Sequence, residues 1–219
     1  MLQIPSKEVH ESVNNYKTKG KQMAAKGYNF NTNPVTVVTP EAKTLFMCLA
    51  EVHEYTGKFG GKLVFTPEQL NQEVSFKENG GAKGRKAFGA IVSELLDNAY
   101  NEYTTDTGKK ATKVSKIQDG TNADGDADGT SVISTANQNQ PDILDSSKKV
   151  IKDYDVLVGN GSTVVAQLYL KPYVMQGKVG VTAYLNKVVL KDIIEFGGSD
   201  DLFDDDTFES DDDTLSDDF

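Results

Sequence analysis

The sequence has no tryptophan, one cysteine and two histidines in 219 residues, and these shortages exclude several kinds of site. Cys48 has no second cysteine for an internal disulfide, and with only His10 and His53 beside it no zinc-ligand spacing exists. Cys48 stands among apolar neighbours, so we expect its thiol to be buried in the core.

Long apolar runs are also missing. No segment approaches the roughly 20 apolar residues that span a bilayer. Residues 1–10 lack the basic-then-apolar order of a signal peptide. We therefore expect an intracellular protein with no membrane partner.

Catalytic motifs are a third absence. The chain has no Walker-type phosphate loop, no nucleophile elbow, and no paired carboxylates on one element outside the C-terminal segment. The run Gly80-Gly81-Ala82-Lys83-Gly84 is glycine-rich, but it lacks the Lys-Ser/Thr end of a nucleotide loop, so we interpret it as a linker. We expect no enzymatic activity, no catalytic residues and no cofactor.

Charge is unevenly distributed along the chain. The net charge of −10 would argue against a nucleic-acid partner if it were evenly spread. However, residues 200–219 hold 11 of the 33 acidic residues and no basic one, which leaves 22 acidic and 23 basic residues in 1–199. We therefore predict a near-neutral body and a disordered acidic tail over 199–219. Residues 1–30 interleave lysines with tyrosines and predict a basic N-terminal arm, which either contacts nucleic acid or is merely solvated.

Residues 40–104 show the patterns of three helices. Thr39-Pro40-Glu41 and Thr66-Pro67-Glu68 each supply an N-cap residue, a proline at the first helical position and an acid in the first turn. They predict one helix to about residue 55, after a short strand, and a second helix over roughly 67–75. A third helix is predicted over about 85–103, with an apolar face formed by Phe88, Ile91, Val92, Leu95 and Leu96.

Residues 105–147 are polar and almost free of aromatic residues, so we interpret most of them as a mobile loop. Within this segment the spaced acids Asp124, Asp126 and Asp128 match the first half of a calcium loop. Position 12 of the pattern is Thr135 rather than a bidentate Glu, and no helices flank it, so we expect no metal site.

The C-terminal body has the alternation of a β-hairpin. A strand is predicted over 149–158, residues 163–171 alternate until Pro172 ends the run, and a second strand follows a turn at 176–177. The apolar phase slips near 186–187, which indicates a bulge. The outward face of this hairpin is then expected to include Gln167, Tyr169, Lys171, Lys178, Thr182 and Tyr184, with Tyr173 at the turn.

Aromatic rings interleaved with lysines suit a protein that binds single strands of any sequence. Each base offers a π face to an aromatic ring, and lysines can follow the phosphates. The candidate residues for binding single-stranded DNA (ssDNA) are Tyr169, Lys171, Tyr173, Lys178 and Tyr184. The alternative is an ordinary amphipathic hairpin whose tyrosines happen to be exposed.

Several short motifs of this region occur in the same order in a known family. Gly159-Asn160-Gly161-Ser162, LYLKPY over 168–173, Val179-Gly180-Val181, Leu190 and Phe196-Gly197-Gly198 precede an acidic tail ending in Phe219. This order resembles the ssDNA-binding proteins of short-tailed bacteriophages. The resemblance implies an α+β fold: an oligonucleotide-binding (OB) five-stranded β-barrel over 31–198. The helix-rich segment 40–104 departs from that barrel, and we interpret it as a winged-helix-like insertion within this domain, which also contains the mobile loop 105–147. The implied role is to coat exposed single strands in DNA replication and recombination, in the cytoplasm of the bacterial host.

The same resemblance implies that the acidic tail occupies the empty DNA groove and docks the phage DNA polymerase and helicase-primase. Apolar residues interrupt the acids, which favours a docking peptide over a merely solubilising end. The oligomeric state stays open, with a homodimer as one candidate. The selected tail residues are Asp211, Asp212, Asp213, Asp217, Asp218 and Phe219.

Two other functions stay open. Residues 40–115, with a candidate recognition helix over 85–103 and a wing over 104–114, also fit a winged-helix regulator that binds duplex DNA. An acidic histone chaperone or DNA mimic would share the tail, but it would not need the Tyr/Lys hairpin.

Overall fold

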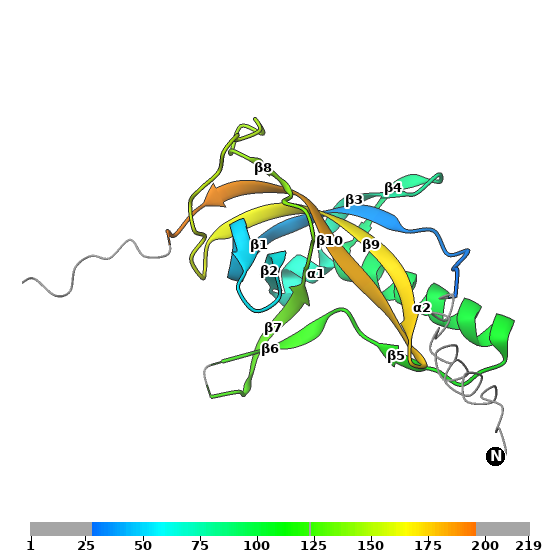
Figure 1. The fold of residues 1–219 in the computed structure, drawn as a ribbon. Coiled ribbons are helices and arrows are strands. Elements are labelled where there is room, and N and C mark those ends of the chain that lie inside the picture. Colours follow the sequence, from blue (N-terminus) through cyan, green and yellow to red (C-terminus); the bar gives the residue numbers. More distant parts are fainter. Residues whose placement is uncertain (1–27, 123, 196–219) are drawn as a thin grey trace, which may run out of the picture.

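The computed structural model describes residues 28–122 and 124–195. The predicted acidic tail lies outside these residues, as does the predicted basic arm except for residues 28–30. In the described part, one ten-stranded sheet and two helices form a mostly β fold with a small helical part (Figure 1). The elements are, in order, β1 (Val35–His53), β2 (Lys58–Phe65), α1 (Pro67–Asn71), β3 (Glu73–Glu78), β4 (Lys83–Ala87), α2 (Phe88–Thr107), β5 (Thr112–Val114), β6 (Gln118–Thr121), β7 (Ala127–Ser134), β8 (Asp142–Leu144), β9 (Thr163–Met175) and β10 (Lys178–Asp192).

The sheet has two ends. Its hydrogen-bonded order is β5-β10-β9-β1-β2-β7-β6, with β8 also on β10 and the β3–β4 hairpin on the start of β1. The prediction of a five-stranded barrel needs correction in two respects, because the described strands are more numerous and their ladder does not close. The two end strands, β5 and β6, are separated only by residues 115–117, so the sheet curls until these ends lie near each other.

β1 occupies the residues for which the first helix was predicted, so that prediction is wrong. Its pairing with β2 slips between Leu45 and Cys48 and again before His53. The extra residues on β1 shift the alternation of side chains, so apolar residues recur at helix-like spacing within a strand. The predicted N-cap residue Thr39 instead accepts a hydrogen bond from the Ala166 amide (3.0 Å) through its hydroxyl. Without this helix, the winged-helix interpretation loses its first element.

The other two helices form, with shifted ends. α1 begins with the predicted cap: the Gln69 amide donates to Thr66 Oγ1 (3.3 Å), and the Thr66 amide donates to the Gln69 side chain (2.7 Å). It ends early because Glu73 already starts β3. α2 begins at Phe88 because the preceding residues form β4. Of the predicted glycine-rich linker, residues 80–82 lie in the turn between β3 and β4, whereas Lys83 and Gly84 already belong to β4. The predicted apolar face of α2 is buried in the core.

The segment 105–147 is not a single loop, because it contains β5, β6, β7 and β8. β7 pairs with β2, and its Ile133 is fully buried. The polarity was misleading because half of the residues in these short strands are exposed and only four are buried. Asp128 of the calcium-like pattern accepts hydrogen bonds from the Thr130 amide (2.8 Å) and hydroxyl (2.6 Å). No group of three or more His, Cys, Asp or Glu among the described residues is placed to hold a metal ion.

β9 and β10 form the predicted hairpin, with the expected bulge between Leu185 and Lys187. β9 does not end at Pro172. β1 pairs with β9 only as far as Leu170, so among the described strands Pro172 has only β10 beside it, and its missing N–H can face away from the ladder. The strand predicted over 149–158 is wrong, because that segment is irregular: a single bridge joins Val150 to Leu144 of β8, and another joins Val158 to Glu195 beyond β10.

The core lies between the inner face of this hairpin, β2 and α2. Phe65 of β2 and Phe88 of α2 are fully buried, with ring centroids 5.0 Å apart. Leu168 and Leu185 of the hairpin are fully buried in the same cluster. Cys48 is half-buried rather than part of this core, and its burial, with a smaller effect of the Glu51 charge, raises the pKa of its thiol. The inner packing leaves the opposite face of the hairpin available for contact. No helix in the described residues is long and apolar enough to cross a membrane.

Candidate nucleic-acid interface

Two tyrosines stand opposite each other on the outer face of the β9–β10 hairpin. Tyr169 and Tyr184 are direct cross-strand partners, with ring centroids 6.3 Å apart and planes inclined by 35°. Tyr184 is 37% exposed, and Tyr169 is half-buried. Lys171 and Thr182 form the pair two residues further along, and Lys171 is exposed. The alternation seen in the sequence therefore brings Tyr169, Lys171 and Tyr184 onto one surface.

Tyr173 is held differently from the other two tyrosines. It lies opposite Gly180, and its ring covers that glycine: a Cβ atom at Gly180 would be 2.6 Å from the Tyr173 hydroxyl. Glycine is therefore required for the observed position of the ring. Lys178 is exposed and pairs with Met175 at the end of the hairpin. The five predicted residues thus follow one face of the hairpin, with Lys171 between the Tyr169–Tyr184 pair and Tyr173.

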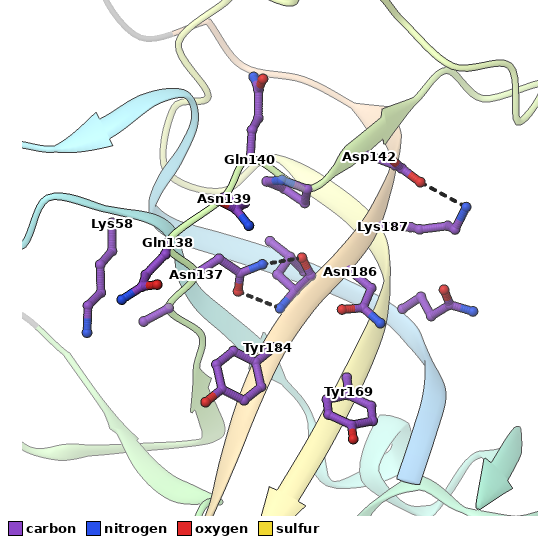
Figure 2. A pocket seen from close by; sticks show the side chains of 14 residues that line it. Lys58, Asn137, Gln138, Asn139, Gln140, Asp142, Tyr169, Tyr184, Asn186 and Lys187 are labelled. Atoms are coloured by element: carbon purple, nitrogen blue, oxygen red, sulfur yellow. Dashed lines mark hydrogen bonds and ion pairs between the residues drawn. The ribbon is translucent and has the colours of Figure 1, made fainter. Parts of the chain in front are cut away.

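The tyrosine pair lines a groove of about 720 Å³, which we call the amide groove (Figure 2). One wall is the outer face of the hairpin, and the other is the segment 136–142, which joins β7 to β8. Figure 2 shows Tyr169 and Tyr184 side by side on the two strands, with the amide side chains beyond them. The groove is lined by Lys58, Ala136, Asn137, Gln138, Asn139, Gln140, Pro141, Asp142, Gln167, Tyr169, Tyr184, Leu185, Asn186 and Lys187.

Asn137 attaches the wall formed by residues 136–142 to two strands, β2 and β10. Its backbone exchanges two hydrogen bonds with Phe59 of β2 (2.8 and 2.9 Å). Its side chain donates to the Leu185 carbonyl (2.6 Å) and accepts from the Leu185 amide (2.8 Å), as Figure 2 shows. β5 and β8 pair with β10 on either side of Leu185, so the Asn137 amide takes the place of a missing strand there.

The amide groove is polar and slightly positive. Its charged lining residues are two lysines, Lys58 and Lys187, and one carboxylate, Asp142, which lies 2.9 Å from Lys187 Nζ. Because both partners are about half exposed, this ion pair is weak and leaves Lys187 able to meet another anion. Side-chain amides present both donors and acceptors, so they can bond the edges of different bases. Six of them line the groove, but Asn137 and Gln140 already bond the backbone of Leu185 and Leu49. The four that remain for base edges are Gln138, Asn139, Gln167 and Asn186.

A second groove, of about 400 Å³, lies beside Tyr173 and Thr182. Lys116, from the link between β5 and β6, lines it together with Gln118 and Met175. Burial lowers the pKa of Lys116, so a phosphate beside it would stabilise the charged form. The Lys171–Thr182 pair lies between this second groove and the Tyr169–Tyr184 pair. The second groove and the amide groove are therefore parts of one surface.

The sequence interpretation missed the wall of amides and the two lysines Lys58 and Lys116. Residues 137–140, Asn-Gln-Asn-Gln, were assigned to the mobile loop on their polarity alone. The sequence feature that could have indicated this wall is the run of four amide residues, which follows a segment rich in β-branched residues and precedes Pro141. The selected tail residues, 211–213 and 217–219, lie outside the described residues.

Comparison with solved structures finds this fold among phage proteins that bind ssDNA. A C-terminally truncated ssDNA-binding protein of bacteriophage Enc34 is 16% identical, with 78% of this chain and 96% of that chain covered and a TM-score of 0.53. The ssDNA-binding protein gp2.5 of bacteriophage T7 is 14% identical, with 81% of this chain and 97% of that chain covered and a TM-score of 0.54. The Enc34 protein in complex with ssDNA is 16% identical, with 78% of this chain and 97% of that chain covered and a TM-score of 0.53. No protein-family model and no curated protein matches the sequence.

The chain therefore has the fold of the phage ssDNA-binding proteins, and the predicted resemblance is confirmed at the level of the fold. Its structural neighbours include the proteins of bacteriophages Enc34 and T7. The OB-like prediction holds in this coarser form, as an open and more elaborate sheet.

Proposed function

We propose that this chain is a non-enzymatic phage protein that binds ssDNA without sequence preference during DNA replication and recombination in the bacterial cytoplasm. The observation that supports this most directly is the pair of facing tyrosines on the edge of the amide groove, with Lys171 beside them. Structural neighbours that bind ssDNA, one of them solved with it bound, support the same function.

In this proposal each kind of side chain meets one part of the strand. Bases stack on Tyr169 and Tyr184, and each stacked base contributes about 1–3 kcal/mol whatever its identity. Lys58, Lys171 and Lys178 neutralise phosphates along the same surface. The amides of the groove replace water on the base edges, and because they both donate and accept they select no single base. Binding is thereby tolerant of sequence.

We also propose that the acidic tail over 199–219 competes with DNA and docks the replicative polymerase and helicase-primase. The support is the distribution of charge: the tail holds 11 carboxylates without a basic residue, whereas the body is close to neutral. Such a segment is attracted to the same lysines that would bind phosphates. Phe219 and the neighbouring acids Asp211, Asp212, Asp213, Asp217 and Asp218 are the proposed contacts with the partner protein.

The test is the affinity of tyrosine variants for a fluorescent oligo-dT, measured by anisotropy. Tyr169→Ala and Tyr184→Ala should each weaken binding by about 5- to 150-fold, because each removes one stacking ring. Tyr184→Phe keeps the ring and should bind within about twofold of the wild type.

Two results would contradict the proposed function. One is a folded Tyr169→Ala/Tyr184→Ala double variant that binds oligo-dT as tightly as the wild type. The other is a strong preference for duplex DNA in competition, which would favour a duplex-binding regulator. Circular dichroism on each variant shows whether the fold is retained.

A further inference from the structure

Phe46 is an exposed aromatic residue in an unfavourable backbone conformation. It lies in β1 with φ of 51°, and its side chain is 60% exposed. A left-handed φ is uncommon for a bulky residue and costs on the order of 1 kcal/mol or more. Burial of the ring does not compensate for this cost, because the ring faces solvent. Conformations of this kind persist where the surroundings enforce them, and they cluster at functional sites.

Three separate features hold Phe46 in this position. β1 contains an extra residue between Leu45 and Cys48 relative to β2, which forms a bulge at Phe46. On the β9 side of β1, the Phe46 amide donates to the Asn160 side chain (2.7 Å). On the partner strand, Gly61 allows the bulged backbone to approach: a Cβ there would lie 2.7 Å from the Phe46 carbonyl oxygen. The exposed ring is therefore specified by residues from three parts of the chain.

The surroundings of the ring are basic and adjoin the amide groove. Lys62 Nζ lies 5.8 Å from the centroid of the Phe46 ring, within range of a cation–π interaction. Phe46 lines a groove of about 330 Å³ that shares Lys58 and Ala136 with the amide groove. None of the residues that line this groove is acidic: they are Phe46, His53, Thr56, Lys58, Phe59, Gly60, Gly61, Lys62, Ser134, Thr135 and Ala136.

We infer that Phe46 is a base-stacking platform that extends the single-strand path from the Tyr169–Tyr184 pair onto the β1–β2 hairpin. The inference rests on the proposed function. Lys58, common to both grooves, would meet the phosphate between the two stacking sites, and Lys62 would meet the next one. A solvated aromatic face beside two lysines is what an unpaired base and its phosphate require. The occupant is thus the same strand, lengthened by further nucleotides.

Oligonucleotide length separates this inference from the proposed function. A four-nucleotide oligo-dT, near the lower limit of about 4 nucleotides for one OB fold, should fill the amide groove only, whereas a strand of about 16 nucleotides should reach both grooves. Phe46→Leu removes the aromatic face but keeps an apolar side chain. It should weaken binding of the long strand by about 5- to 150-fold and leave binding of the short strand unchanged. Phe46→Tyr keeps an aromatic ring and should bind the long strand as tightly as the wild type.

A spectroscopic readout tests the contact itself. The chain has no tryptophan, so Phe46→Trp introduces a single tryptophan, whose emission can be excited apart from that of the tyrosines. Its emission should be quenched by the long strand and not by the short one. The matched control is Phe76→Trp, because Phe76 lines neither of these two grooves, and its emission should not respond.

The two ideas fail in different ways. Long-strand binding by Phe46→Leu as tight as that of the wild type, with unquenched Trp fluorescence in the Phe46→Trp variant, would overturn the inference and leave the proposed function intact. Absence of long-strand binding by the wild-type protein, or an unaffected Tyr169→Ala/Tyr184→Ala variant, would instead overturn the proposed function.

Discussion

Asn137 shows how one side chain can replace a strand. Its amide bonds the Leu185 amide and carbonyl where β10 lacks a neighbour, while its backbone bonds Phe59. Asn137→Ala would leave the Leu185 groups without these partners, so we expect a loss of about 1–3 kcal/mol in the free energy of unfolding. Urea denaturation followed by circular dichroism measures it, as a lower midpoint with an unchanged slope.

The neighbouring Asn139 supplies the matched control for that prediction. Its side chain is exposed and lines the same groove, so Asn139→Ala should change the free energy of unfolding by no more than about 0.5 kcal/mol. Equal destabilisation by the two variants would show that Asn137 does not bridge β2 and β10.

Residues differ in how far the sequence reveals them. Tyr169, Lys171 and Tyr184 were found because a regular strand places alternate side chains on one face, and that regularity is written in the sequence. Phe46 and Asn137 were not found. Their roles depend on a bulge in β1 and on a bridge between residues 137 and 185, which are contacts between distant parts of the chain. No local pattern records such contacts.

At the scale of elements, the same contrast separates α2 from β1. α2 has an uninterrupted helical period and a left-handed Gly108 at its end, so it could be predicted within a few residues. β1 is irregular because β2, β3 and β9 all pair with it, and its bulges imitate a helical period. The helix start predicted from the capping motif at Thr66 was correct, whereas the residues after the similar motif at Thr39 form part of strand β1.

Helix capping gives a prediction at this scale. Thr66 caps α1 through its hydroxyl, whereas Ala87 precedes α2 without a side-chain cap. Thr66→Ala should therefore lower the free energy of unfolding by about 1 kcal/mol, and Ala87→Ser should raise it by about 0.5–2 kcal/mol. Thermal and urea unfolding of the two variants measure these changes. A destabilised Ala87→Ser variant would mean that the β4 pairing of residue 87, rather than the helix end, dominates there.

α2 also holds the start of the described chain through a carboxylate. Glu102 accepts hydrogen bonds from the Asn31 amide (2.5 Å), the Thr32 amide (2.7 Å) and hydroxyl (2.5 Å), and Tyr28 (3.2 Å). Burial alone would raise the pKa of Glu102, but these hydrogen bonds outweigh it and lower the pKa below its ordinary value. The same carboxylate and Asp106 raise the pKa of Tyr28, Asp106 most strongly.

The lowered pKa of Glu102 predicts a pH-dependent contribution to stability. A carboxyl group whose pKa is lower in the folded state stabilises the fold above its unfolded pKa of about 4.3, and that contribution is lost as pH falls through the folded pKa. Glu102→Gln should lower the urea midpoint at pH 7 and reduce the decline of the midpoint between about pH 5 and pH 3. Asp97→Asn, which removes an exposed ion pair with Lys113, is the control and should have little effect. If the urea midpoint of the Glu102→Gln variant declines with falling pH as steeply as that of the wild type, other carboxylates cause the decline.

For the whole molecule, the separation of charge matters more than its total. Removing residues 199–219 changes the formal net charge from −10 to about +1, because the tail holds 11 acids and no basic residue. If the tail competes for the lysines of the ssDNA face, the shortened protein should bind oligo-dT more tightly. Its affinity should also depend more steeply on salt, because DNA then displaces counterions from those lysines instead of the tail.

Affinities of the full and shortened chains across a salt series test this prediction. Each phosphate contact with a single strand adds about −0.7 to the slope of log K against log salt, so Lys171→Ala should reduce the slope of the shortened protein by about that amount. Phe219→Ala is the matched control: it keeps every charge of the tail, so DNA affinity should stay within about twofold while contact with the polymerase weakens. Identical affinities and slopes for the full and shortened proteins would mean that the tail does not compete with DNA for this face.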